Sequence, residues 1–84
     1  MSPREQRLLA ELEYHSGVLS AWRLTRRTGV LYPTATLRRM EGLGWVRQAA
    51  RFTYPHEGFA PPAWYITSQG REALSAETER GDER

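Results

Sequence analysis

Three of the seven glycines divide the first half of the chain into short segments, each of which has the pattern of a helix. These glycines are Gly17, Gly29 and Gly44. Glycine commonly follows the last turn of a helix, because it adopts the left-handed conformation without the steric penalty of a Cβ atom. The chain up to Gly44 is therefore constrained to short helices that are joined by tight turns.

The first of these helices has a well-marked start. Ser2 is suited to cap it, Pro3 suits its first turn, and Glu5 completes a capping box with Ser2. The residues expected on its inner face are Leu8, Leu9 and Leu12. We expect this helix to end at Gly17 and a short strand to follow at residues 18–19.

Two more helices are predicted before Gly44. Ser20 is expected to cap a helix over residues 21–28, and Pro33 to begin another that runs to about Leu43. Residues 29–32 form the turn between them. The expected inner residues are Leu24 with Ala21 and Thr28 in the earlier helix, and Leu37 and Met40 in the later one.

The pattern changes after Gly44. Residues 45–52 and 63–67 are predicted to be strands, the second because it is rich in aromatic and β-branched side chains. Residues 53–62 contain three prolines and a glycine, which indicates a loop. The two strands would therefore form a hairpin with a long loop.

A fourth helix is predicted after the hairpin, from residue 68 to about residue 79, with Thr67 as its cap. Leu74 is its only large apolar residue, so we expect it to pack weakly on the domain or against a partner. The last five or so residues are expected to fray. Residues 1–75 would form the domain proper, and residues 76–84 the end of this helix and a charged tail.

Composition excludes several classes of protein. The chain of 84 residues fits one small domain, and it has no cysteine for a disulfide or a thiolate metal site. No apolar run approaches the roughly 20 residues of a membrane span. His15 and His56 have no neighbouring carboxylate pair, and there is no phosphate-binding glycine loop. We therefore expect a cytoplasmic protein with no enzymatic activity, no metal and no cofactor.

The positive charge is concentrated in the middle of the chain. Residues 21–51 contain seven arginines and one acidic residue, a net charge of +6, whereas the whole chain carries +2. This distribution points to an anionic partner, with nucleic acid as the first candidate. All twelve basic residues are arginines, which suit phosphate and guanine edges, although the codon bias of a GC-rich genome would also explain the missing lysines.

The predicted order of elements is that of a winged helix-turn-helix, an α+β, mainly α fold with a two-stranded wing and a C-terminal helix. Residues 20–29 (SAWRLTRRTG), 37–46 (LRRMEGLGWV) and 64–74 (WYITSQGREAL) are similar to S-G-Y-E-I-A-R-R-L-G, L-R-R-L-E-x-x-G-W/L-V and Y-R-L-T-E-E-G-R-A-A-L of PadR-like transcriptional regulators. MarR-like winged-helix proteins are the next most similar family. The resemblance implies a sequence-specific regulator that binds double-stranded DNA.

Two departures from the PadR-like pattern bear on the site. The segment from Gly29 to Leu37 is two residues shorter than usual, and the family's G-T-L-Y-P is replaced by residues 31–34, which align in two ways. The wing also carries Ala-Pro-Pro-Ala at residues 60–63 in place of an arginine pair. The shortening leaves the identity of the base-reading residues open.

The third helix is expected to enter the major groove, with side chains opposite its inner face meeting the bases. That face would carry Ala35 and Arg39, with Arg38 beside them. Arg39 is the expected base reader and Arg38 is expected nearer the backbone. The alternative is that one of these arginines pairs with Glu41, or that both form a solvated helical face.

The second helix and the wing are expected to contact phosphates, which would position the protein without reading sequence. The residues expected to contact DNA are Arg23, Arg26, Arg27, Tyr32, Thr34, Ala35, Thr36, Arg38, Arg39, Arg47 and Arg51. For the second-helix arginines a solvated face is the alternative. His56 near the loop tip is a weaker candidate for a minor-groove contact.

Five aromatic residues are expected to fill the core beside the small sheet, in preference to stacking on single-stranded bases. They are Trp22, Trp45, Phe52, Trp64 and Tyr65. Tyr54 and Phe59 lie in the loop and are expected to contact a partner or the loop itself.

Function and assembly follow from these expectations. We expect a DNA-binding transcription regulator, a possible homodimer formed through the first and fourth helices, and no small-molecule effector or membrane contact. Two alternatives remain open, which are a winged helix that binds another protein and an architectural DNA-binding protein of a phage or plasmid.

Overall fold

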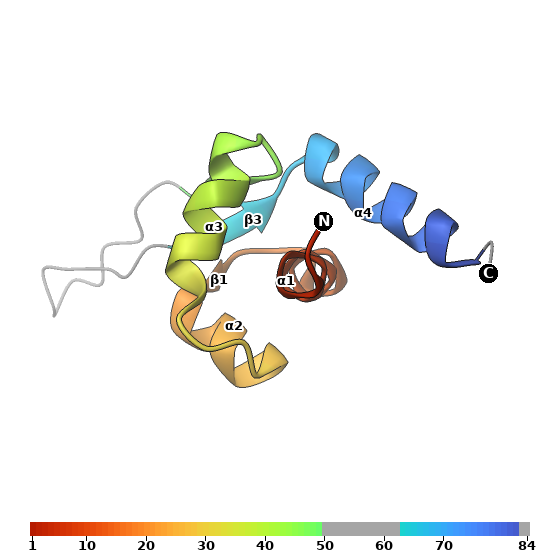
Figure 1. Ribbon diagram of the computed structural model, residues 1–84. Coiled ribbons are helices and arrows are strands. Elements are labelled where there is room, and N and C mark those ends of the chain that lie inside the picture. The colour runs from red at the N-terminus through yellow and green to blue at the C-terminus, as the bar shows by residue number, and fades with distance from the viewer. Residues whose placement is uncertain (50–62, 83–84) are drawn as a thin grey trace, which may run out of the picture.

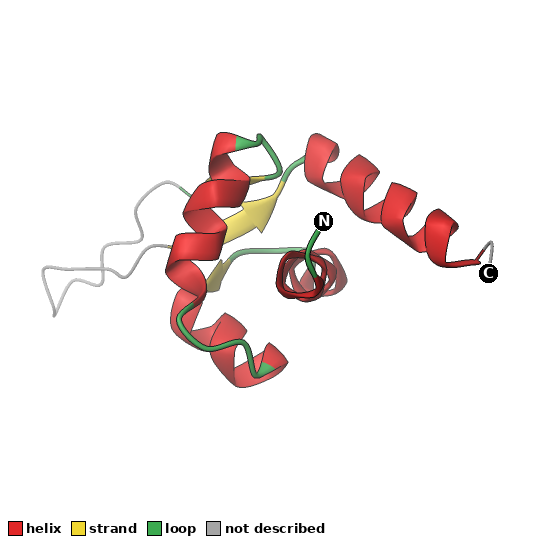
Figure 2. Ribbon diagram, viewed as in Figure 1, coloured by secondary structure: helices red, strands yellow, loops and turns green. Residues whose placement is uncertain are grey.

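The computed structural model describes residues 1–49 and 63–82 and has the winged helix-turn-helix architecture (Figures 1 and 2). Its elements are α1 (Pro3–His15), β1 (Leu19–Ser20), α2 (Ala21–Thr28), α3 (Pro33–Gly42), β2 (Val46–Gln48), β3 (Ala63–Ile66) and α4 (Ser68–Asp82). The three strands form one antiparallel sheet in the order β1-β3-β2. The predicted fold class is confirmed, and the short strand β1 joins the two wing strands in the sheet.

The capping box at the start of α1 is confirmed. The Glu5 amide donates to Ser2 Oγ at 3.2 Å, and the Ser2 amide donates to Glu5 Oε1 at 2.9 Å. The predicted end of the helix is wrong by one residue, because the left-handed residue that closes α1 is Ser16, with φ of 56°, and not Gly17. The Ser16 hydroxyl donates to the Glu13 carbonyl at 3.3 Å, a local bond of the kind that lets serine occupy such a position.

The predicted limits of α2 and the predicted start of α3 are also confirmed. Ser20 Oγ accepts from the Arg23 amide at 3.2 Å, and Gly29 closes α2 with φ of 77°. Between the helices Tyr32 adopts a left-handed conformation with φ of 52°, directly before Pro33. The chain thus turns sharply before α3 at a residue other than glycine.

The two wing strands pair with Val46 opposite Ile66 and Gln48 opposite Trp64. The predicted strands are confirmed over β2 and β3. Strand β2 ends at Gln48, one residue before the end of the described segment, whereas the predicted strand continues to residue 52. Residues 50–52 of that prediction and the loop at 53–62 lie outside the described residues. Gly70 lies in the first turn of α4 at a close approach, because a Cβ atom there would come within 2.2 Å of the Trp45 carbonyl oxygen.

The core lies where α1, α2 and α3 meet the sheet. Its buried residues are Leu8, Leu9, Leu12, Leu19, Leu24, Val30, Leu37, Met40, Val46, Trp64 and Ile66. Every leucine or methionine predicted for an inner face of the first three helices is fully buried. Residues far apart in sequence therefore share one compact core around α1.

The prediction of an aromatic core holds only in part. Trp64 is buried and Trp45 is half-buried, but Trp22 is 65% exposed and Tyr65 is 37% exposed. The predicted burial of Trp22 is wrong. Trp22 precedes Leu24 by two residues, a rotation of about 200° that turns its side chain away from the inner face of α2. Tyr65 alternates with the inward-facing Trp64 and Ile66 along β3, so it faces outward. Phe52, Tyr54 and Phe59 lie outside the described residues.

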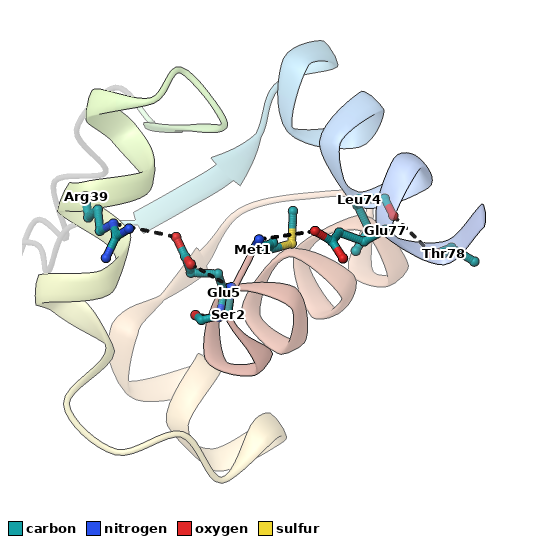
Figure 3. Close-up of polar contacts among 7 residues, drawn as sticks. All are labelled: Met1, Ser2, Glu5, Arg39, Leu74, Glu77 and Thr78. Carbon is teal, nitrogen blue, oxygen red and sulfur yellow. Dashed lines mark hydrogen bonds and ion pairs between the residues drawn. The ribbon is translucent and has the colours of Figure 1, made fainter. Parts of the chain in front are cut away.

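Helix α4 contacts the domain at several points between its first turn and Glu77. Leu74 is half-buried against the core, and Arg71 Nε lies 2.7 Å from Glu13 Oε2 on α1. The Met1 amine lies 3.1 Å from Glu77 Oε1 (Figure 3). The helix continues to Asp82, beyond the predicted end near residue 79, and its end beyond Glu77 extends away from the domain (Figure 1). Among the described residues, no helix is long and apolar enough to cross a membrane.

Candidate nucleic-acid interface

Helix α3 lies against the core by one face and exposes the opposite face. Pro33, Leu37 and Met40 are buried. Thr34, Ala35 and Arg38 are exposed, and Arg38 makes no hydrogen bond or ion pair with the described part of the chain. An exposed helical face with a free guanidinium is physically suited to a groove of DNA.

Arg39 differs from Arg38 because it has an acidic neighbour on α1. Its side chain is 74% exposed, and its Nε lies 3.9 Å from Glu5 Oε2 (Figure 3). The alternative pairing with Glu41 is wrong for the described residues, since neither arginine pairs with that side chain. Glu41 follows Arg39 by two residues, a rotation of about 200° that places the two side chains on different flanks of α3.

Glu5 is buried, with only 4% of the residue exposed. Its Oε1 accepts from the Ser2 amide, while Oε2 has no hydrogen-bond partner among the described residues. The Ser2 amide is the main cause that lowers the pKa of Glu5 below its ordinary value of 4.5; burial opposes this and the charge of Arg39 supports it. The charged carboxylate is therefore the favoured form beside Arg39.

Arg4 ties the start of α1 to the turn before α3. Its Nη2 donates to the carbonyls of Leu31 and Tyr32, the latter at 3.1 Å, and its Nε donates to Thr36 Oγ1 at 3.3 Å. Thr36 is thus half-buried on the flank of α3 that faces α1, whereas Tyr32 is 87% exposed. In this conformation the Thr36 hydroxyl is engaged within the protein.

Arg4 and Glu5 were not among the predicted site residues. The sequence does contain a pattern that indicates a special role for Glu5. Glu5 precedes Leu9 by four residues and Leu12 by seven, which places it on the buried stripe of α1. An acidic residue on such a stripe indicates a specific polar or charged partner.

The three arginines of α2 are exposed and surround a shallow hollow of about 340 Å³ that Trp22 also lines. The Arg26 guanidinium lies over the Trp22 ring, 5.0 Å from its centre, and Arg27 Nη1 lies 3.1 Å from Glu11 Oε1. Arg23 makes no ion pair in the described part of the chain. Two of these guanidinium groups are thus already held in place by neighbours.

Only part of the predicted wing contacts can be located. Arg47 is exposed on β2, opposite Tyr65 on β3. Arg51 and His56 lie outside the described residues. Across residues 1–49 and 63–82, no three histidine, aspartate or glutamate side chains gather into a group that could hold a metal ion.

Comparison with solved structures supports the fold. A chain described as a reported archaeal mechanosensitive channel that is a structural homolog of MarR-like transcriptional regulators is similar with a TM-score of 0.73 and 24% sequence identity. The similarity covers 99% of the present chain and 62% of the other, so this chain spans less than two thirds of that relative. No protein-family profile and no curated protein matches the sequence. The class of protein is thus defined by its winged-helix fold.

Proposed function

We propose that this protein is a sequence-specific regulator of transcription that binds double-stranded DNA and inserts α3 into the major groove. The observation that carries the proposal is the arrangement of α3, whose inner residues Leu37 and Met40 are buried while Arg38 and Arg39 face outward. A helix of this kind fits the major groove, and an arginine there can form two hydrogen bonds with guanine. The similarity to a solved structure that is a structural homolog of MarR-like transcriptional regulators supports the same function.

The contacts divide by role. Arg39 reads a base edge, and Arg38 lies nearer the phosphates, with Tyr32, Thr34 and Ala35 at the same surface. Thr36 contributes to it only if its bond with Arg4 opens. The arginines of α2 and of the wing neutralise phosphates, and these are Arg23, Arg26, Arg27, Arg47 and Arg51.

The protein acts as a PadR-like cytoplasmic homodimer that needs no small-molecule effector. The end of α4 beyond Glu77 extends away from the domain, and α1 exposes Tyr14, which is 83% accessible. Pairing of α4 and α1 with a second copy would cover these surfaces and would match a pseudo-palindromic site. Sedimentation at tens of micromolar protein tests this, and a single species of 9.7 kDa that binds one half-site would contradict it.

Selection of genomic fragments with the purified protein tests the function. We expect enrichment of one pseudo-palindromic sequence, with an affinity at least about a thousandfold above that for random duplex DNA at the same salt concentration. Equal binding to all duplexes with strong bending would indicate an architectural protein. The absence of duplex binding at low salt would instead favour a protein-interaction module, with exposed Trp22 and Leu31 as its surface.

A further inference from the structure

We infer that Glu5 is a positioning residue for Arg39, which holds the Nε side of that guanidinium and leaves the paired Nη groups for a base edge. This inference rests on the proposed function, because it deals with how the base-reading arginine is oriented. It assigns a role in sequence discrimination to a buried residue of α1 that does not touch DNA.

The two partners differ in how firmly they are held. Arg39 is largely in solvent, whereas the Glu5 side chain is 5% exposed and anchored through Oε1 by the Ser2 amide. Its other oxygen, Oε2, has no hydrogen bond in the described part of the chain and lies toward Arg39 (Figure 3). A buried carboxylate that the Ser2 amide anchors therefore faces an exposed guanidinium, so the acid is the fixed partner of the pair.

The geometry of the guanidinium explains the benefit. Nε is the atom that lies near Glu5, at 3.9 Å, and the Nη1 and Nη2 groups occupy the opposite end of the planar group. Those two groups can make the bidentate contact with O6 and N7 of guanine. An ion pair at Nε restricts the Arg39 side chain before DNA binds. Less conformational freedom is therefore lost when the guanidinium contacts guanine.

The first turn of α1 is also fixed relative to α3 by a second contact. Arg4, the residue before Glu5, bonds the carbonyls of Leu31 and Tyr32 and the hydroxyl of Thr36. Thr36 and Arg39 are three residues apart and therefore lie on the same flank of α3. Glu5 on α1 and Arg39 on α3 therefore lie about one turn from the contact of Arg4 with Thr36, which links the two helices.

The test uses Glu5→Gln, which keeps an oxygen that can accept from the Ser2 amide and so preserves the capping box, but removes the charge. Glu13→Gln is the matched control, because it neutralises an acid of the same helix whose partner, Arg71, belongs to α4. The affinity of each variant is measured for the selected site and for random duplex DNA. Thermal melting confirms that each variant is folded.

We expect Glu5→Gln to lower the ratio of the two affinities by about threefold to tenfold, as for coupled neighbours. The same change made in an Arg39→Ala background should leave the ratio unaltered, and Glu13→Gln should leave it at the wild-type value. A purely structural role of Glu5 would lower both affinities together. If Glu5 only repels phosphate, Glu5→Gln would instead raise the affinities for both DNAs. Either of these two results would overturn the inference.

A measurement without DNA separates the inference from the proposed function. The ¹⁵Nε resonance of Arg39, assigned by its loss in Arg39→Lys, should shift in Glu5→Gln, while that of Arg38 should not. An unchanged Arg39 resonance would refute the positioning role even if specific DNA binding is found. A shifted resonance in a protein that prefers no duplex sequence would instead refute the proposed function, and the role in discrimination with it.

Discussion

Helices α3 and α4 both pack on α1, but they are held by different kinds of contact. Helix α3 buries Leu37 and Met40 completely and is bound from the side by Arg4 and Glu5. Helix α4 contributes the half-buried Leu74, the buried Gly70, and the ion pairs of Arg71 with Glu13 and of Glu77 with the Met1 amine. The difference indicates that α3, the helix proposed to read DNA, is anchored by completely buried side chains, whereas α4 has no large side chain buried to that degree in the part of the chain that the structure describes, and its end beyond Glu77 extends away from the domain (Figure 1).

The largest effect is expected for the core residue of α3. Leu37→Ala should lower the free energy of unfolding by about 2–5 kcal/mol, because it removes a fully buried side chain and leaves a cavity. In a domain of this size that loss would unfold a large fraction of the molecules. Chemical denaturation measures it, and a midpoint equal to that of the wild type would show that the inner face of α3 is assigned wrongly.

The next effect concerns the outer face of the same helix. Arg39→Ala should weaken binding to the selected site by about 1–3 kcal/mol and relax the preference at one base pair, if this arginine forks onto guanine. Arg38→Ala should weaken binding to all sequences and reduce the salt slope by about one unit, as expected for a phosphate contact. Titrations at several salt concentrations distinguish the two. Wild-type binding by both variants would exclude α3 as the reading helix.

A smaller effect on stability is expected for α4. Leu74→Ala should cost about 1 kcal/mol in the isolated domain, since the side chain is only half-buried. If α4 forms the dimer interface, the cost should depend on protein concentration, because dissociation then contributes to unfolding. Melting curves at two concentrations a hundredfold apart measure this. A loss as large as that of Leu37→Ala would remove the contrast between the two helices.

The smallest effect concerns the acid that lies beside α3. The pKa of Glu5 is lowered in the folded state, chiefly by the Ser2 amide, so the charged form contributes stability above its ordinary pKa of 4.5. That contribution should disappear as the pH falls through the lower pKa of the folded state. The stability difference between wild type and Glu5→Gln should therefore change between pH 7 and pH 3. A difference independent of pH over this range would contradict the assigned charge.

Local patterns in the sequence were sufficient for most of the fold. The capping box at Ser2, the cap at Ser20 and the glycine after α2 act within four residues, so they could be recognised without knowledge of the tertiary structure. The buried leucine faces of the helices could be predicted from the sequence in the same way, because they depend only on the helical period. Trp22 follows the same rule, since helical period turns it away from the buried Leu24 and its aromatic side chain is not drawn into the core.

The sequence by itself determined the helices, their order and the concentration of arginine at residues 21–51. Only the tertiary structure decided which charges meet, since Glu5 on α1 and Arg39 on α3 are separated by the strand β1 and the helix α2. Likewise, nothing in the sequence connects Arg4 with Leu31 and Thr36. Helical period and capping are properties of neighbouring residues, but the approach of α1 to α3 depends on how the whole core packs, and it is that approach which orients the proposed reading arginine.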